Sequence, residues 1–277
     1  MKICSITSGS SGNCVYLETE KSRILIDAGY SGKQLEQLMK GCGINPFQLD
    51  AIFVTHEHAD HIKGVGVLSR RYRIPVFASD GTWAAMDRRV GAITQAHRRC
   101  FSPEKPFSFR DIEVHPFSTH HDAAQPVGYS FYEGEEKVSV LTDTGYIDDR
   151  MLRAVSDSQI YYIEANHDVQ MLRHGRYPQK LQERILSNLG HMSNVQSAQA
   201  LTELLRGQGE IVLLAHLSEE NNTPVICLHT VVAILEENGM DPRRDQTIVV
   251  APRFSPSPLF SCRKRPEREI VLQGVFA

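Results

Sequence analysis

The sequence predicts an α/β protein in which two β-sheets pack face to face and helices cover the outside. Three observations support this fold class. The chain has 277 residues, of which 41% are hydrophobic, so it can build a sizeable core and is too hydrophobic to be disordered. Short runs of strand-forming residues dominate the first half and recur as hairpin pairs. In the second half, helical patterns separate the strands, as expected of helices that lie on the outside of sheets.

The strands are predicted from short apolar runs that are rich in β-branched and aromatic residues and bounded by turn residues. Residues 8–13 hold three serines, two glycines and an asparagine, which predicts the flexible turn of a hairpin between the first two strands. The predicted strands are 2–7, 14–19, 23–26, 51–54, 75–78, 112–117, 127–132, 137–141, 159–163 and 211–215.

Three helices are predicted from their end signals and from apolar residues at three- and four-residue spacing. Ser31 and Gln34 form a capping box, and the helix that they begin should end at Gly43. Ser193 is the predicted N-cap of a second helix. Pro224 begins a third helix, which should end at Gly239.

Charge and cysteine usage exclude several classes of protein. A net charge of −3 excludes histone-like and polyacidic proteins, so any nucleic-acid site must be local. The six cysteines contain no CxxC pair and are predicted to be reduced thiols. The N-terminus lacks a basic start followed by an apolar run, and no segment approaches the roughly 18 apolar residues of a membrane span. We therefore expect a cytoplasmic protein.

The composition changes only at the end of the chain. Residues 251–277 hold five basic and two acidic side chains, a net charge of +3, together with four prolines. We therefore expect a folded domain over residues 1–250 and a basic, proline-containing C-terminal tail over residues 251–277.

The most informative segment is residues 56–61, which read His-Glu-His-Ala-Asp-His and directly follow a predicted buried strand. Four potential metal ligands stand in these six positions. Imidazole and carboxylate ligands suit zinc, iron or manganese, and the absence of thiolates favours an open catalytic site over a closed structural one. The spacing is not that of the HExxH helix, because Asp60 stands four residues after His56. A solvated, histidine-rich loop is the alternative interpretation.

This motif resembles the HxHxDH signature of the metallo-β-lactamase superfamily, with His56, His58, Asp60 and His61 in the signature positions. Asp27 matches the first motif of the superfamily, which precedes this signature. The motifs that follow the signature are matched at later predicted strand ends. The resemblance implies a four-layer αββα sandwich and a metallo-β-lactamase-fold hydrolase domain over residues 1–250.

The resemblance also implies two divalent metal ions, which could be zinc, manganese or iron, with Asp27 supporting the metal loop without binding an ion. The implied ligands are His56, His58 and His121 for one ion, Asp60, His61 and His216 for the other, and Asp143 as the bridge. His120 competes with His121 for its place, but close relatives read His-Asp-Ala here, which favours His121.

Hydrolysis is the reaction that such a site implies. Two-metal centres hold their ions about 3.5 to 4 Å apart, create a bridging hydroxide near neutral pH and clamp an oxyanion. The oxidoreductases of the superfamily would need a carboxylate where this chain has His58, so a redox reaction is disfavoured.

Two further segments resemble the tRNA-processing nuclease RNase Z: Ile-Glu-Ala at 163–165 and His-Met-Ser at 191–193. In that family the Glu and the His form a pair that protonates the leaving oxygen. The candidate catalytic residues are therefore Asp60, Glu164 and His191, with Glu164 orienting the imidazole of His191. The alternative is that Glu164 is an ion-paired glutamate at a strand end and that His191 has no functional role.

Along most of the chain, the sequence resembles the YycJ (WalJ) group, bacterial proteins that are similar to DNA exonucleases. Three strings carry this resemblance: residues 8–13, residues 190–194 and residues 215–222. Asp143 and His216 are only 73 positions apart, which leaves no room for the second domain of the β-CASP nucleases. The chain also lacks the glycine- and proline-rich arm with which RNase Z grips tRNA.

The resemblance therefore implies a dinuclear-metal phosphodiesterase, a DNA exonuclease whose partner is nucleic acid. Residues 62–100 hold eight basic and two acidic side chains, and they could form a track for phosphates or an ordinary solvated surface. The alternative functions are an RNase Z-like ribonuclease, a hydrolase of small esters, lactones or cyclic phosphodiesters, and a metal-binding protein without turnover.

Overall fold

The computed structural model describes residues 1–262, so the predicted tail beyond residue 262 lies outside the described residues. The described chain forms two compact units. Unit 1 comprises residues 1–118, 123–133 and 252–261, and unit 2 comprises residues 119–122, 134–251 and 262. The strands belong to two seven-stranded sheets, ordered β14-β1-β2-β3-β4-β5-β6 and β13-β12-β11-β10-β9-β8-β7.

Unit 1 contains most of the strands. Its strands are β1 (Lys2–Thr7), β2 (Cys14–Glu18), β3 (Arg23–Ile26), β4 (Ala51–Phe53), β5 (Val76–Ser79), β6 (Arg98–Phe101), β7 (Phe107–Phe109), β8 (Ile112–Ser118), β9 (Val127–Glu133) and β14 (Phe260–Ser261). Its helices are α1 (Gly32–Gly41), α2 (Ala59–Ile62), α3 (Val65–Tyr72) and α4 (Asp80–Val90), with 3₁₀ turns at Pro46–Gln48 and Gln95–His97.

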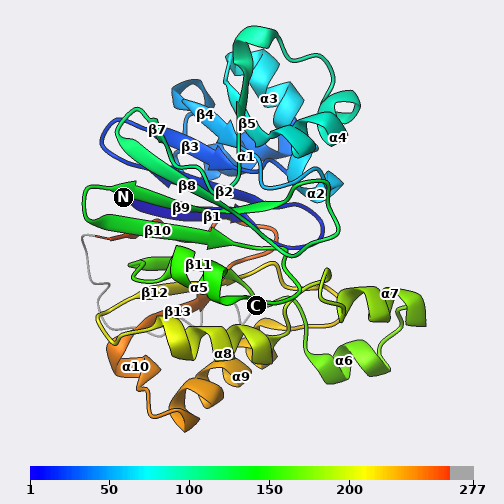
Figure 1. The fold of residues 1–277 in the computed structure, drawn as a ribbon, viewed down its shortest axis with the longest axis vertical. Coiled ribbons are helices and arrows are strands. Elements are labelled where there is room, and N and C mark those ends of the chain that lie inside the picture. Colours follow the sequence, from blue (N-terminus) through cyan, green and yellow to red (C-terminus); the bar gives the residue numbers. More distant parts are fainter. Residues whose placement is uncertain (263–277) are drawn as a thin grey trace. The chain divides into compact units, whose positions relative to one another are not determined.

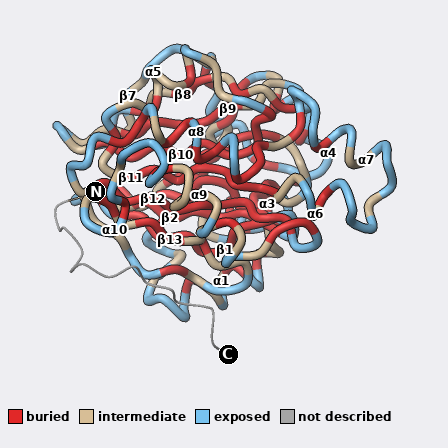
Figure 2. Tube along the Cα trace, turned by 90° about the horizontal axis from the view of Figure 1, so that it is seen from below, coloured by how far each residue is buried: buried red, intermediate tan, exposed pale blue. Residues whose placement is uncertain are grey.

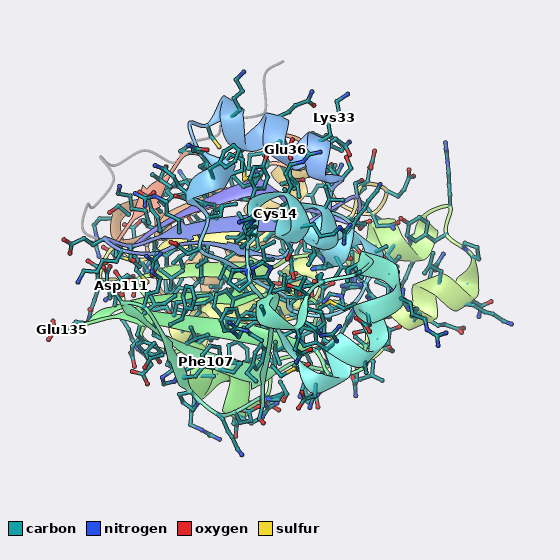
Figure 3. The ribbon with its side chains drawn as sticks, turned by 90° about the horizontal axis from the view of Figure 1, so that it is seen from above. Cys14, Lys33, Glu36, Phe107, Asp111 and Glu135 are labelled. Carbon is teal, nitrogen blue, oxygen red and sulfur yellow. The ribbon has the colours of Figure 1, made fainter. Side chains whose placement is uncertain are left out.

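In unit 1, the strands change from antiparallel to parallel pairing at β3. Strands β1, β2 and β3 pair antiparallel, β3 to β6 pair in parallel, and β7, β8 and β9 form an antiparallel meander. Helices α1, α3 and α4 lie on one side of β3, β4 and β5 (Figure 1). Their apolar sides, with Leu35, Leu68 and Met86, join a buried cluster with the strands. Figure 3 shows the exposed Lys33 of α1 at the surface.

Unit 2 alternates strands and helices. Its strands are β10 (Glu136–Leu141), β11 (Ile160–Glu164), β12 (Ile211–Ala215) and β13 (Thr247–Val250). Its helices are α5 (Asp149–Val155), α6 (Val169–His174), α7 (Gln179–Ile185), α8 (Asn194–Leu204), α9 (Pro224–Glu237) and α10 (Pro242–Asp245).

The four strands of unit 2 pair in parallel in the order β10, β11, β12, β13. Every residue of β11 and of β12 is buried, which explains their nearly uninterrupted apolar sequences. Figure 2 shows this contrast between the buried strands and the exposed helix α7. Because the strands are parallel, their carboxyl ends meet at one edge of the sheet.

All the predicted strands are confirmed to within one or two residues at each end, and so are the three predicted helices. Ser31 and Ser193 each form the capping box of a helix, and Pro224 is the first residue of α9. The prediction did not include α3 and α4, which flank β5 within the basic stretch 62–100.

Residues 252–261, the first part of the predicted tail, belong to unit 1. Strand β14 pairs with β1, and Ser257 exchanges two hydrogen bonds with Ser5, at 2.8 and 3.0 Å. This segment therefore extends the first sheet at its β1 edge.

All six cysteines are free thiols, as predicted. Among the described residues, no helix combines the length and the apolar character needed to cross a membrane.

Candidate metal centre

In unit 1, residues 56–61 leave the end of β4 and enter the single turn of α2. His58 is the N-cap of α2, and Asp60 and His61 lie within it. The ring centroid of His56 lies 4.6 Å from that of His58 and 4.1 Å from that of His61. Nε2 of His61 lies 3.6 Å from Oδ2 of Asp60. The four predicted ligands of the motif are therefore neighbours within unit 1.

Asp27 positions this cluster through hydrogen bonds to Thr55 and His61. Its buried carboxylate accepts hydrogen bonds from the backbone N–H of Thr55 at 2.8 Å and from the Thr55 hydroxyl at 2.7 Å. Nδ1 of His61 lies 2.7 Å from Oδ2 of Asp27. Because a carboxylate only accepts, it holds the ring proton on Nδ1, so the lone pair of the imidazole is on Nε2. The geometry fits the supporting role that the sequence implies for Asp27.

Replacing Asp27 with Ala is expected to weaken zinc binding by about 10- to 100-fold, the usual cost of removing a partner that orients a metal-binding imidazole. The affinity can be measured by competition with a chromogenic chelator. Asp50→Ala is the matched control, because the Asp50 carboxylate also accepts a backbone hydrogen bond in unit 1, from Arg23. An equal loss in both variants would contradict the role of Asp27.

The backbone of the motif is held by two neighbouring segments. The N–H of Asn13 donates to the carbonyl of Asp60 at 2.7 Å, and the N–H of Ala28 donates to that of His61 at 2.8 Å. At Gly29, a Cβ would lie 1.7 Å from the Asp60 carbonyl oxygen, so only glycine fits there. The side-chain nitrogen of Asn13 lies 3.1 Å from Nε2 of His61. The sequence analysis missed this contact, although Asn13 ends the string 8–13.

In unit 2, a second cluster forms at the carboxyl ends of the parallel strands. Asp143 follows β10, Glu164 ends β11, His216 follows β12, and His191 precedes α8. Each of these side chains offers one nitrogen or oxygen atom, and these four atoms lie within 4.8 Å of one another. The structure therefore brings the predicted ligands Asp143 and His216 together with Glu164 and His191, two of the three predicted catalytic residues.

Glu164 is the hub of the cluster in unit 2. Its Oε1 lies 2.8 Å from Nδ1 of His191 and 2.8 Å from Nδ1 of His216. Its Oε2 accepts hydrogen bonds from the backbone N–H groups of Thr144 and Met192, at 3.1 and 3.2 Å. Burial alone would raise the pKa of Glu164, but the two imidazoles hold it far below its usual range. Glu164 is therefore ionised and fixes both rings with Nδ1 protonated.

The structure distinguishes His120 from His121. Nε2 of His121 lies 3.7 Å from Oδ1 of Asp143, and its Nδ1 lies 3.1 Å from the carbonyl of Gly190. His120 turns toward Asp148, with its Nε2 2.9 Å from Oδ2 of that carboxylate. His121 is thus the one of the two whose side chain lies beside Asp143.

Three of these residues adopt the left-handed backbone conformation that L residues other than Asn and Asp rarely enter. The φ angles are 61° at Asp27, 58° at Asp143 and 55° at His216. Each residue stands directly after a strand or one residue beyond it. Such a conformation costs on the order of 1 to 3 kcal/mol and is typically found at functional sites.

A comparison with protein families identifies the fold family. The model of the Beta-lactamase superfamily domain matches residues 22–217. The chain belongs to this superfamily. It is 43% identical to the exodeoxyribonuclease YycJ of Bacillus anthracis over 234 residues, which cover 84% of this chain and 89% of that protein. It is also 43% identical to the exodeoxyribonuclease WalJ of Streptococcus pneumoniae, over 83% of this chain and 87% of that one.

More distant comparisons agree with this assignment. Ribonuclease Z of Natronomonas pharaonis is 30% identical over 47% of this chain and 45% of that protein. Among solved structures, the metallo-beta-lactamase fold protein YhfI from Bacillus subtilis matches with a TM-score of 0.70 and 15% identity, over 92% of this chain and 98% of that one. The predicted fold class and the resemblance to the YycJ (WalJ) group and RNase Z are confirmed.

The donor atoms of this superfamily member fit divalent metal ions. Among the described residues, the clusters of both units consist of buried or half-buried imidazoles and carboxylates without a cysteine, a donor set that suits zinc, manganese or iron at an open site. In each unit a carboxylate that is not a predicted ligand, Asp27 or Glu164, occupies Nδ1 of a predicted histidine ligand. This pairing is the usual second layer around metal-binding histidines.

His167 is a buried residue near this cluster that the sequence analysis missed. Its imidazole is 1% exposed, and among the described residues neither ring nitrogen has a hydrogen-bond partner. Burial lowers the pKa of His167 to about 4, although Glu164 opposes this shift. The imidazole of His167 is therefore neutral at pH 7. The sequence signal that could have identified this residue is its position three residues after Glu164, in the string Glu-Ala-Asn-His-Asp at 164–168.

The low pKa of His167 predicts a loss of stability in acid. The unfolded state takes up the proton near pH 6.5 and the folded state only near pH 4, so the free energy of unfolding should fall by about 3 kcal/mol across this window. His167→Gln, which cannot titrate, should lack this part of the decrease. Urea unfolding at several pH values, without metal, measures the free energy of unfolding of the wild type and of His167→Gln. An identical pH dependence of the two would refute the prediction.

Several of the basic side chains of residues 62–100 have partners within unit 1. Arg70 donates to the carbonyls of Val90 and Ala92, and Arg71 pairs with Glu36. The other paired arginines of this stretch are Arg89, which donates to the carbonyl of Glu57, Arg98, which pairs with Asp87, and Arg99, which donates to the carbonyl of Arg98. Lys63, Arg73 and Arg88 are exposed.

Proposed function

We propose that this protein is a dinuclear-metal phosphodiesterase that degrades DNA from an end. The observation that carries the proposal is the 43% identity to the exodeoxyribonuclease YycJ across 84% of the chain, in a sequence that carries the HxHxDH motif at residues 56–61. The YycJ match covers 89% of that protein, so the similarity is not limited to a shared metal motif.

The proposed metal centre uses the ligand set that the superfamily resemblance implies. Its ligands are His56, His58 and His121 for one ion, Asp60, His61 and His216 for the other, and Asp143 for both. When bound, two such ions supply an activated water and stabilise negative charge on the phosphate. The ions are zinc, manganese or iron, and the superfamily membership and the donor chemistry of each unit support this assignment.

The proposed acid is His191. Its Nδ1 proton is held by Glu164, so a second proton on Nε2 is the one available to the leaving 3′-oxygen of DNA. Glu164 is a positioning residue in this scheme, because it touches the imidazole and not the substrate. Its hydrogen bond to His216 means that one carboxylate orients both the proposed acid and a proposed metal ligand.

The proposed substrate contacts outside the metal centre are electrostatic. Lys63, Arg73 and Arg88 are exposed cations of unit 1 that can meet phosphates, whereas Arg70 and Arg71 already bind protein groups. We also propose that the protein acts in the cytoplasm and that the hydrolase domain comprises residues 1–250 together with the segment 252–261, which joins unit 1.

Reloading metal-free protein separately with Mn²⁺ and Zn²⁺ tests the function. The protein is offered single-stranded and duplex DNA, each with and without a 5′-phosphate, and RNA of the same sequence. Release of mononucleotides from DNA ends is the expected result. Cleavage of bis-p-nitrophenyl phosphate without cleavage of any nucleic acid would overturn the proposal in favour of a small-molecule esterase.

A second candidate, an RNase Z-like ribonuclease, is favoured by the Glu164–His191 pair, whose Oε1–Nδ1 distance is 2.8 Å. The RNA arm of the same assay distinguishes it, because preferential cleavage of RNA would establish the ribonuclease.

A further inference from the structure

We propose that the stacked rings of His120 and Tyr146 in unit 2 form a subsite on which a nucleobase of the substrate stacks. This inference rests on the proposed nuclease function and assigns a role to His120, which the metal ligand set leaves without one. The two ring centroids lie 4.1 Å apart, and the ring planes are inclined by only 8°. Tyr146 is 37% exposed, so part of its ring is open to a ligand.

The pair is held in place before any substrate binds. The carboxylate of Asp148 lies 2.9 Å from Nε2 of His120 and fixes the plane of the imidazole. The hydroxyl of Thr144 accepts a hydrogen bond from the N–H of His120 at 3.1 Å and donates one to the carbonyl of Tyr146 at 2.8 Å. The N–H of Gly145 donates to the carbonyl of His120 at 2.9 Å. A platform fixed in this way loses little conformational entropy when a ligand stacks on it.

The pair lies next to the cluster of unit 2. His120 directly precedes His121, and Tyr146 comes three residues after Asp143. The backbone N–H of Thr144 donates to Oε2 of Glu164 at 3.1 Å, so the residue that ties the two rings together also contacts the carboxylate that positions His191. A base on this platform would therefore belong to a nucleotide close to the reacting phosphate.

The groups beside the pair favour a base over a phosphate as the ligand, because the carboxylate of Asp148 contacts His120 and would repel a phosphate, and the exposed apolar side chain of Leu189 lies nearby. Leu189 is 52% exposed, and its carbonyl accepts a hydrogen bond from the N–H of Asp122 at 3.2 Å, two residues after His120. The loop that carries Leu189 packs closely on Gly145, where a Cβ would lie 2.4 Å from the carbonyl carbon of Asn188. Every nucleobase has a π-face, so such a surface binds DNA ends without regard to sequence, as an exonuclease requires.

The test compares two DNA substrates: a single-stranded oligonucleotide with ordinary ends, and one whose terminal nucleotides at both ends lack their bases. Base stacking is typically worth about 5- to 150-fold in affinity. Tyr146→Ala should lower the ratio of kcat/KM between the base-bearing and the abasic substrate by a factor in that range. Tyr146→Phe and Tyr146→Trp, which keep an aromatic ring, should retain the wild-type ratio.

Phe47→Ala provides the matched control, because Phe47 is also an exposed aromatic residue that is paired with a second ring, that of Tyr72, in unit 1. Phe47→Ala should change kcat/KM for neither the base-bearing nor the abasic substrate. A second readout is the fluorescence of 2-aminopurine placed at the DNA ends, which is quenched by stacking. Wild-type protein should quench it, and Tyr146→Ala should quench it less.

The outcomes separate this inference from the proposed function. If the wild type degrades DNA and Tyr146→Ala keeps both the base preference and the quenching, the subsite is wrong and the nuclease assignment stands. If the wild type degrades no DNA, the nuclease assignment fails and the subsite, which rests on it, fails too. A loss of the base preference in Tyr146→Ala that Tyr146→Phe restores establishes the subsite.

Discussion

Asp143→Asn is expected to lose both metal ions together and, with them, the hydrolysis of DNA. In unit 2, Asp143 lies beside His121, with Oδ1 3.7 Å from Nε2, and its own Oδ1 lies 3.5 Å from Nδ1 of His216. A neutral amide in this place removes the anion proposed to bridge the ions. The loss of affinity should exceed the roughly 100-fold cost of removing an outer partner such as Asp27.

Metal content after dialysis, measured by mass spectrometry, checks this result for both ions at once. The fold should survive, because Asn tolerates the left-handed backbone of residue 143, where φ is 58°. The thermal unfolding midpoint of the metal-free variant should therefore match that of the metal-free wild type. Binding of two ions by Asp143→Asn with wild-type affinity would refute the bridging assignment.

His191→Ala is expected to separate protonation of the leaving group from metal binding. The 3′-oxygen of DNA leaves as a strongly basic alkoxide and needs a proton, whereas p-nitrophenolate leaves without one. General acid catalysis is typically worth about 10² to 10⁴-fold, so activity on DNA should fall by a factor in that range and activity on bis-p-nitrophenyl phosphate by much less. The metal content should stay at the wild-type value.

The measurement compares kcat/KM for both substrates and the metal content in wild type, His191→Ala and a control. His174→Ala serves as that control, because His174 is an exposed histidine of unit 2 whose Nδ1 bonds within its own helix, to the carbonyl of Gln170. Equal losses on both substrates would make His191 a residue that positions the substrate. Loss of a metal ion would make it a ligand.

The positions of the strands and of the local metal motif are predictable from the sequence because their signals lie within a few residues. Residues 56–61 carry three imidazoles and a carboxylate beside a buried strand, and this local pattern places the cluster of unit 1 at the end of β4. In contrast, the double role of Glu164 depends on the parallel pairing of β11 with β12, which brings Glu164 opposite Ala215, next to His216. No local signal reports that juxtaposition.

The basic stretch shows the same limit for charge patterns. The eight cations in residues 62–100 left a phosphate track and an ordinary solvated surface as alternatives, and folding brings the carbonyls of Val90 and Ala92 to Arg70 and the carboxylate of Glu36 to Arg71. The partners of these two arginines are 20 to 35 residues away in the chain. Similarly, spacing left His120 and His121 as competitors, and only the positions of Asp143 and Asp148 show which ring faces which group.

The left-handed backbone at His216 has a consequence for protein engineering. Glycine or asparagine enters this conformation more easily than histidine does. A library selected only for resistance to heat should therefore enrich glycine or asparagine at residue 216, where either would remove a proposed metal ligand. Selection for nuclease activity should retain His216, so the two screens would choose different sequences from the same library.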